Sequence, residues 1–203
     1  MTADSANPRR RPKGDKRERT RAALLDAALA LTREQGFERT SLQDIARRAG
    51  MTTGAIYGNF RNRDGLYMAL AERQWGPIRP VFAPGSSFAD KMAAVAEAVI
   101  AAIPERRAAA VGALTFRAYA LTHAEVGQRF HDAMASGFEL GAAWLATQLE
   151  PDEAPMPLDQ LVRVINALIE GLLFQRFLTP DLMPDDTIRA AFAALAGRRA
   201  AEN

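Results

Sequence analysis

The chain has 203 residues, enough for one domain of ordinary size or two small ones sharing a core. It has no cysteine and two histidines, which excludes disulfides and cysteine nucleophiles and argues against a structural zinc site. The net charge of +2 is unevenly spread, because residues 1–65 carry 14 Lys and Arg against 8 Asp and Glu. Such a concentration is expected of a module that contacts phosphates, although basic tails are also common on unrelated domains.

The first segment, MTADSANPRRRPKGD, predicts a disordered basic arm over residues 1–15, because it cannot bury enough apolar area to order itself. The arm either follows DNA or is an inert tail. Nothing in it resembles a signal peptide, and the longest apolar stretch, residues 92–103, is too short to span a bilayer. We therefore expect a soluble cytoplasmic protein with no membrane partner.

Residues 16–35 repeat apolar side chains at helical spacing and predict a first helix. The stretch TSLQDIARRAGMTTGAIYGN, residues 40–59, then predicts two short helices joined by a tight turn. Ser41 and Asp44 have the spacing of a capping box at the start of the first of these helices. Gly50 stands where a left-handed residue would end it, and the second helix begins after a possible cap, Thr52. The pattern is that of a helix-turn-helix.

A fourth helix is expected from residue 62 or 63 to residue 75, followed by a segment rich in Gly and Pro that marks a domain boundary. We expect a first domain over residues 16–75 and a second over residues 76–203. No alternation typical of strands appears, and the fold class is all-α. Pro104 is expected to start a new helix. The helices expected in the second domain are residues 88–103, 105–121, 125–149, 158–178 and 185–197.

A series of spaced motifs runs through residues 21–70: Leu24-Leu25, Ala27-Ala28, Glu34-Gln35-Gly36-Phe37, Thr40-Ser41, Asp44-Ile45-Ala46, Ala49-Gly50, Thr52, Ile56-Tyr57 and Asn59-Phe60. This series resembles the N-terminal DNA-binding domain of the tetracycline-repressor (TetR) family of bacterial regulators. Thr32 departs from the family pattern, which usually has a large apolar residue there, and Asn59 stands where histidine is common.

The resemblance implies DNA contacts at matching positions. Thr52, Tyr57 and Arg63 would meet phosphates, and Thr53, Gly54 and Gln43 would face bases. Asn59 can still donate to a phosphate. The glycines at 54 and 58 each cost about 1 kcal/mol of helix propensity, which favours either close backbone approach to the groove or a simply tolerated glycine.

The resemblance also implies a C-terminal ligand-binding and dimerisation domain. Candidate walls of an effector cavity are aromatic, apolar or polar side chains that also fit an ordinary core: Phe116, Arg117, Tyr119, His123, Phe130, Met134, Phe138 and Trp144. Candidate contacts of a homodimer come from the last two helices, which alternatively complete the monomer core: Leu168, Gly171, Leu172, Gln175, Ile188 and Phe192.

Together these features predict a ligand-responsive transcriptional regulator, most simply a repressor that binds a palindromic double-stranded DNA operator as a homodimer. A small, largely apolar effector would release it. One alternative is a DNA binder without ligand response, and another is a helical small-molecule-binding protein or enzyme. Because the sequence holds no nucleophile–base pair, metal cluster or cofactor loop, we expect no catalytic activity and no cofactor.

Overall fold

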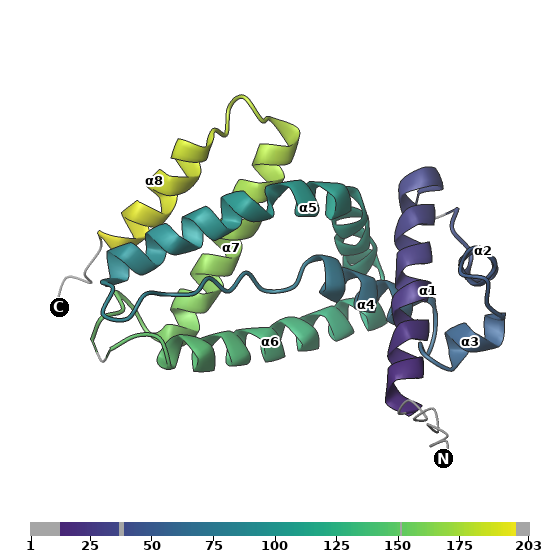
Figure 1. Ribbon diagram of the computed structural model, residues 1–203. Helices are drawn as coiled ribbons and strands as arrows, with labels where there is room; N and C mark the ends of the chain where they lie inside the picture. Colours follow the sequence, from purple (N-terminus) through teal and green to yellow (C-terminus); the bar gives the residue numbers. More distant parts are fainter. Residues whose placement is uncertain (1–12, 37–38, 151, 198–203) are drawn as a thin grey trace, which may run out of the picture. The chain divides into compact units, whose positions relative to one another are not determined.

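The computed structural model describes residues 13–36, 39–150 and 152–197, and within these ranges every regular element is an α-helix (Figure 1). The chain divides into two compact units, Met1–Arg73 and Gln74–Asn203. Most of the expected basic arm, residues 1–12, lies outside the described residues, as does Phe37, while residues 13–15 open the first helix. Within the described ranges, no helix combines the length and the apolarity needed to cross a bilayer.

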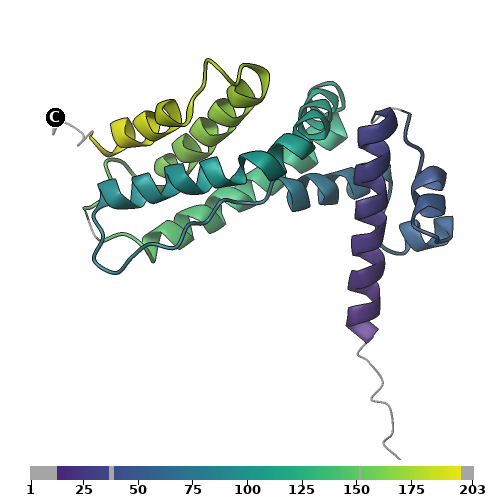
Figure 2. The same cartoon turned by 45° about the horizontal axis from the view of Figure 1, so that its top comes forward.

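The described residues of the N-terminal unit form four helices: α1 (Lys13–Gln35), α2 (Leu42–Arg48), α3 (Thr53–Tyr57) and α4 (Arg63–Gln74). Figures 1 and 2 both show α2 and α3 on the same side of the long α1. Each helix contributes a fully buried aliphatic side chain to one small core: Leu24, Ile45, Ile56 and Leu66. The unit is thus held together by burial of one apolar stripe from each helix.

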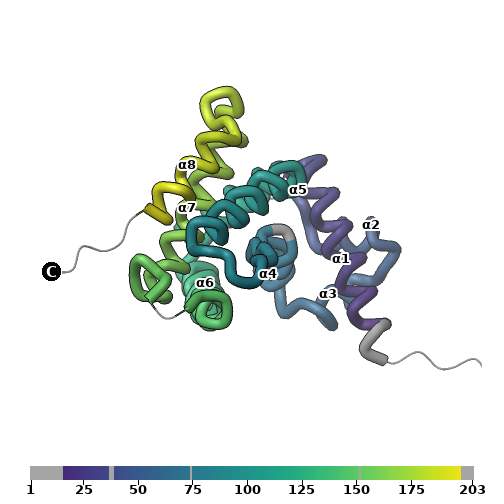
Figure 3. Tube along the Cα trace, turned by 60° about the vertical axis from the view of Figure 1, so that its left-hand side comes forward, coloured from purple at the N-terminus to yellow at the C-terminus, as the bar shows by residue number. Residues whose placement is uncertain are grey.

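The C-terminal unit also holds four helices: α5 (Phe88–Thr122), α6 (Ala124–Ala146), α7 (Leu158–Leu178) and α8 (Asp185–Ala196). The longest, α5, contacts the other three, and α6 also packs along α7 (Figure 3). The segment of residues 76–87 precedes α5 and has no regular structure. The core gathers around Met92 and Val99 of α5, Leu161 and Leu173 of α7, and Phe192 of α8.

The prediction that Pro104 separates two helices is wrong, because α5 is continuous through it. Proline lacks the N–H that would bond the carbonyl of Ile100, and its ring crowds that carbonyl, so it bends a helix at a cost of about 3 kcal/mol. Figure 1 shows the two halves of α5 running in different directions. Apolar residues are buried on both sides of the proline, among them Val99 and Phe116, and this burial keeps both halves helical.

Two buried threonines of the N-terminal unit allow a matched test of polar burial. The Thr32 hydroxyl is buried without a hydrogen-bond partner, whereas the Thr40 hydroxyl donates to the carbonyl of Gly36 at 2.8 Å. Valine has the shape of threonine without the hydroxyl. We expect T32V to raise the free energy of unfolding by about 1 kcal/mol and T40V to lower it by about 1–2 kcal/mol. Urea unfolding followed by circular dichroism measures both, and a destabilised T32V would contradict this account.

Candidate functional site

A capping box fixes the start of α2. The Ser41 hydroxyl oxygen accepts from the backbone N–H of Asp44 at 3.1 Å, and the Asp44 carboxylate accepts from the Ser41 N–H at 3.4 Å. This confirms the capping box predicted from the sequence. The Ser41 hydroxyl also donates to the carboxylate at 2.6 Å, and this bond, with help from Arg47, holds the pKa of Asp44 below its ordinary value. The Asp44 carboxylate of the capping box is therefore ionised at neutral pH.

Gly50 ends α2 with a left-handed backbone, φ +66°, as the sequence predicts. Its N–H donates to the carbonyl of Arg47 at 3.1 Å, and the next N–H, of Met51, donates to that of Ala46 at 2.8 Å. These two bonds close the helix end. Because the left-handed conformation strains any residue with a Cβ, Gly50 sets the direction in which the chain enters α3.

One face of the short helix α3 is buried in the N-terminal unit, and the opposite face is exposed to solvent. Ile56 is fully buried and Phe60, just beyond the helix, is nearly so. Tyr57 is 58% exposed, and Gly54 is exposed beside it. Thr52 occupies the N-cap position, but its exposed side chain makes no capping bond, so the hydroxyl is not used to stabilise the helix. Exposed aromatic and hydroxyl groups that do nothing for folding are candidates for recognition.

The other residues predicted to contact DNA differ in whether their side chains also make hydrogen bonds within the unit. Gln43 is exposed on α2 and Thr53 is half-buried at the start of α3. Asn59 donates its amide N–H to the carbonyl of Ala55 at 2.8 Å, and Arg63 donates to that of Thr40 at 3.5 Å. Asn59 and Arg63 therefore serve the structure of the unit as well as any contact outside it.

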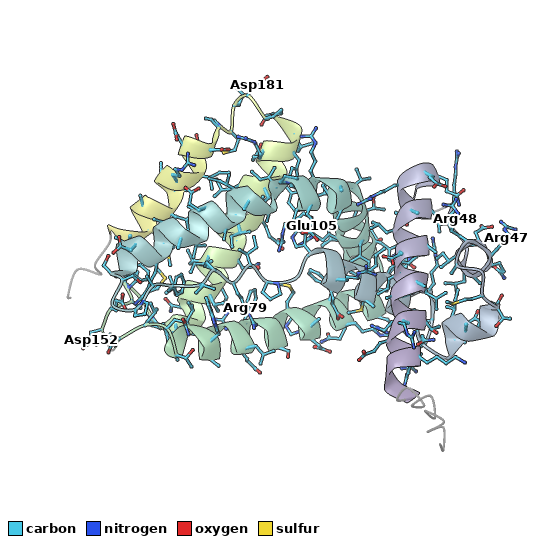
Figure 4. The ribbon with its side chains drawn as sticks, viewed as in Figure 1. Arg47, Arg48, Arg79, Glu105, Asp152 and Asp181 are labelled. Atoms are coloured by element: carbon cyan, nitrogen blue, oxygen red, sulfur yellow. The ribbon has the colours of Figure 1, made fainter. Side chains whose placement is uncertain are left out.

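Exposed guanidinium groups adjoin this face. Arg47 and Arg48 project from α2 (Figure 4), and the Arg47 side chain is 80% exposed. Arg47 pairs with Asp44, and Arg48 pairs with Glu34 of α1 at 2.8 Å. Exposed pairs of this kind contribute about 0–1 kcal/mol, so phosphates can exchange for the carboxylates at little cost.

The C-terminal unit contains a cavity of about 470 Å³ bounded by α6, α7 and the segment of residues 76–87. Its wall is largely apolar, with Met134 and Phe138 from α6 and Ile165 from α7. A Cβ at Gly141 would come within 2.5 Å of a methyl group of Val162, so α6 and α7 approach closely there. One turn earlier, a Cβ at Gly137 would meet nothing within 4 Å, which leaves the cavity open.

Trp75 forms part of this wall immediately after α4 ends at Gln74. Its ring stacks on Phe174 with centroids 5.2 Å apart, and guanidinium carbons of Arg106 and Arg117 lie 5.1 and 5.6 Å from its centroid. Its indole N–H is buried without a hydrogen-bond partner. An unpaired buried donor of this kind costs about 1–3 kcal/mol.

Comparison with known proteins identifies the N-terminal unit. Residues 24–70 match the family described as bacterial regulatory proteins, tetR family. This stretch of the chain is a tetR-family domain. AcrR of Shigella flexneri, an HTH-type transcriptional regulator, is 44% identical over 55 residues, which are 27% of this chain and 26% of that protein.

TtgR of Pseudomonas putida, a second HTH-type transcriptional regulator, is 44% identical over 63 residues, 31% of this chain and 30% of that protein. These alignments span under a third of either regulator. A likeness over the whole fold is found with GusR of Salmonella enterica, with a TM-score of 0.61 at 20% identity over 88% of this chain and 95% of that one. The C-terminal unit is thus similar in fold rather than in sequence.

The eight side chains predicted to line an effector cavity fall into two groups. Three of them line the cavity: Met134, Phe138 and Trp144. The other five are not part of its wall: Phe116, Arg117, Tyr119, His123 and Phe130. The second group lies on the C-terminal half of α5 and around its junction with α6.

The five residues outside the wall make contacts with one another or with α7. Phe116 packs edge-on against Phe130 with centroids 6.2 Å apart, and Tyr119 stacks on His123 at 3.7 Å. Arg117 forms an ion pair with Glu170 of α7. These contacts hold the five residues outside the cavity wall.

Sequence reasoning missed the parts of the cavity wall that come from other segments. Trp75 is the last residue of the expected fourth helix, and Arg79 lies in the expected domain junction. Asn166 and Ile169 lie on α7, for which the sequence suggests a role in the core or the dimer. The available signals were a tryptophan beside a Gly-Pro pair and an apolar face on α7 wider than one neighbour requires.

The predicted dimer contacts at Ile188 and Phe192 are wrong for this conformation, because both side chains are fully buried within the protomer. They belong to the core between α8 and α5. Leu172 is buried in the same core and Leu168 packs against it, whereas Gly171 and Gln175 are exposed. A second copy can reach the outer face of α7 but not these core residues.

The two glycines on α6 give opposite expectations. Replacing Gly137 by Ala adds a methyl group in open space and should stabilise the unit by about 1 kcal/mol through helix propensity. Gly141→Ala gains the same propensity but forces the stiff side chain of Val162 to move, so we expect net destabilisation. Urea unfolding of both variants tests the packing, and equal effects would show that α6 and α7 are not in close contact at Gly141.

Proposed function

We propose that this chain is a dimeric, ligand-responsive transcriptional repressor that binds an inverted-repeat operator. The observation that carries the proposal is the outer face of α3, where Thr52, Gly54 and Tyr57 are exposed on a helix fixed by its buried side. A tetR-family domain at the same residues supports it. A helix-turn-helix places its second helix in the major groove, and the N-terminal residues of that helix contact base edges.

In this proposal Thr52 and Tyr57 donate their hydroxyls to phosphates, and Arg63 adds positive charge at the start of α4. Gln43, Thr53 and the backbone at Gly54 face base edges. Few long side chains are available on α3, so DNA shape and the spacing of the two half-sites supply much of the specificity. Gly54 and Gly58 have no positive φ to explain them, which favours close backbone approach to the groove as their role.

A second copy of the chain would bind the outer face of α7. Exposed residues recur there at helical spacing: Val164, Ala167, Gly171, Gln175 and Leu178. Leu178 is 70% exposed, and nothing lies within 4 Å of a Cβ at Gly171, so a facing helix can approach closely. Exposed alanines of α8, at positions 190, 193 and 194, would extend the same surface.

The cavity would hold the effector, and Trp75 would transmit its presence. Trp75 lines the cavity and directly follows the last residue of α4. The next residue, Gly76, is held to α5, because its carbonyl accepts a hydrogen bond from Arg106. A ligand that shifts the indole therefore shifts the end of α4. Release from the operator requires that the ligand bind the two settings of α4 with different affinity.

Selection of duplexes from a random pool, followed by binding assays across a salt series, tests the DNA-binding proposal. We expect an inverted repeat to be enriched and the affinity to fall steeply with salt. Failure to enrich any sequence at about 0.15 M salt would contradict specific operator binding.

Substitutions on α3 test the assignment of its faces. Because a hydrogen bond to a charged group contributes about 1.5–3 kcal/mol, Tyr57→Ala should weaken binding to all duplexes about tenfold or more. Tyr57→Phe, which keeps the ring, should lose the hydroxyl part alone. Thr53→Ala should instead change the preference among half-site sequences. Fluorescence anisotropy measures both, and a sequence-dependent effect at Tyr57 would show that the faces are reversed.

The dimer surface is tested by one substitution made at two exposed alanines. Ala167→Arg places a charge on the proposed interface, whereas Ala143→Arg places the same charge on α6 away from it. We expect A167R to be a monomer with weakened operator binding and A143R to stay a dimer. Light scattering after size exclusion gives the mass, and a dimeric A167R would place the interface elsewhere.

A further inference from the structure

The polar groups on the cavity wall are predominantly hydrogen-bond donors. The Arg79 side chain carries guanidinium N–H groups and no acceptor, and the Trp144 side chain carries an indole N–H. Asn166 is the one amide among the described lining residues and can turn either edge toward a ligand. No Asp or Glu belongs to the wall in the described part of the chain. A wall of this kind matches a ligand that brings acceptors.

The charges near the wall favour a negative ligand as well. Figure 4 labels Arg79 on the segment of residues 76–87, which leads into α5, and Arg79 is one of the residues of the cavity wall. Two more guanidinium groups, those of Arg106 and Arg117, lie against the ring of Trp75. Arg117 is paired with Glu170, and Glu105, which acts electrostatically on Arg106, is exposed on α5. These carboxylates are thus paired or turned to solvent, whereas Arg79, itself an exposed residue, belongs to the cavity wall.

The indole N–H of Trp75 is buried and makes no hydrogen bond to the described residues, and the ring that carries it belongs to the cavity wall. Buried donors are ordinarily paired, but this N–H has almost no accessible surface, so an acceptor can reach it only when the ring moves.

We propose that the cavity is selective for apolar organic anions, with the ligand carboxylate or equivalent acceptor near Arg79 and its apolar body between α6 and α7. This inference rests on the proposed function, because it names the chemical class of the effector. The cavity of about 470 Å³ falls within the range typical of small-molecule sites. Organic cations of the same size and shape would bind more weakly, because no carboxylate among the described lining residues is available to pair with them.

Two probes that differ only in the charged end test the selectivity. 4-Phenylbutyrate is an anion and 4-phenylbutylamine a cation at neutral pH, with the same phenyl ring and a chain of the same length. Isothermal titration of the full chain with each probe is expected to give at least tenfold tighter binding of the anion. Arg79→Gln should reduce this preference severalfold, whereas Arg107→Gln, at an exposed arginine of α5 outside the wall, should retain it.

Gly137→Leu locates the binding site, because a side chain at that position projects into the open space of the cavity. We expect it to abolish binding of the anion while circular dichroism shows an intact helical fold. Equal or tighter binding of the amine, failure of both probes to bind, or anion binding that survives in folded G137L would each overturn the proposal.

Titrating the same preparations with the selected duplex separates this inference from the proposed function. Normal operator binding with no preference for the anion would overturn the ligand class and leave the DNA-binding role in place. Anion selectivity without sequence-specific DNA binding would support the ligand class and remove the regulatory role.

Discussion

Burial of α5 on several sides is the constraint on which the C-terminal unit depends. Ile188 and Phe192 of α8 are fully buried in the core that α5 shares with α7, and α6 and α7 pack on α5 and on each other. With the inner face of α8 committed in this way, the proposed dimer would use the outer faces of α7 and α8. The same packing leaves α6, α7 and the segment before α5 to form most of the cavity wall, so one helix positions both the proposed dimer surface and the proposed effector site.

The parts of the fold that the sequence predicts correctly depend on chemistry within four residues along the chain. Ser41 and Asp44 cap α2 regardless of what α2 packs against, and Gly50 tolerates its left-handed backbone without help from distant residues. Pro104 shows the limit of such local rules. A proline commonly opens a helix, but apolar residues buried on both sides of this one keep α5 continuous.

The site was predictable only where one helix supplies it. Helical spacing groups Met134 and Phe138 on one face of α6, and both line the cavity. Arg79 lies on a segment without periodicity, and its place in the wall depends on contacts between residues far apart in the chain. Periodicity also shows that Phe192 is to be buried but not by which neighbour, so the sequence could not distinguish the protomer core from a dimer interface.

The placement of the tryptophans has a practical consequence. The chain contains two, Trp75 and Trp144, and both belong to the cavity wall. All of its indole fluorescence therefore arises beside the space where an effector would sit, and a compound that enters changes the surroundings of both emitters at once. The intrinsic fluorescence of the unlabelled protein therefore reports whether the cavity is occupied. Because Trp75 directly follows α4, the same signal reports on the segment that leads to the DNA-binding unit.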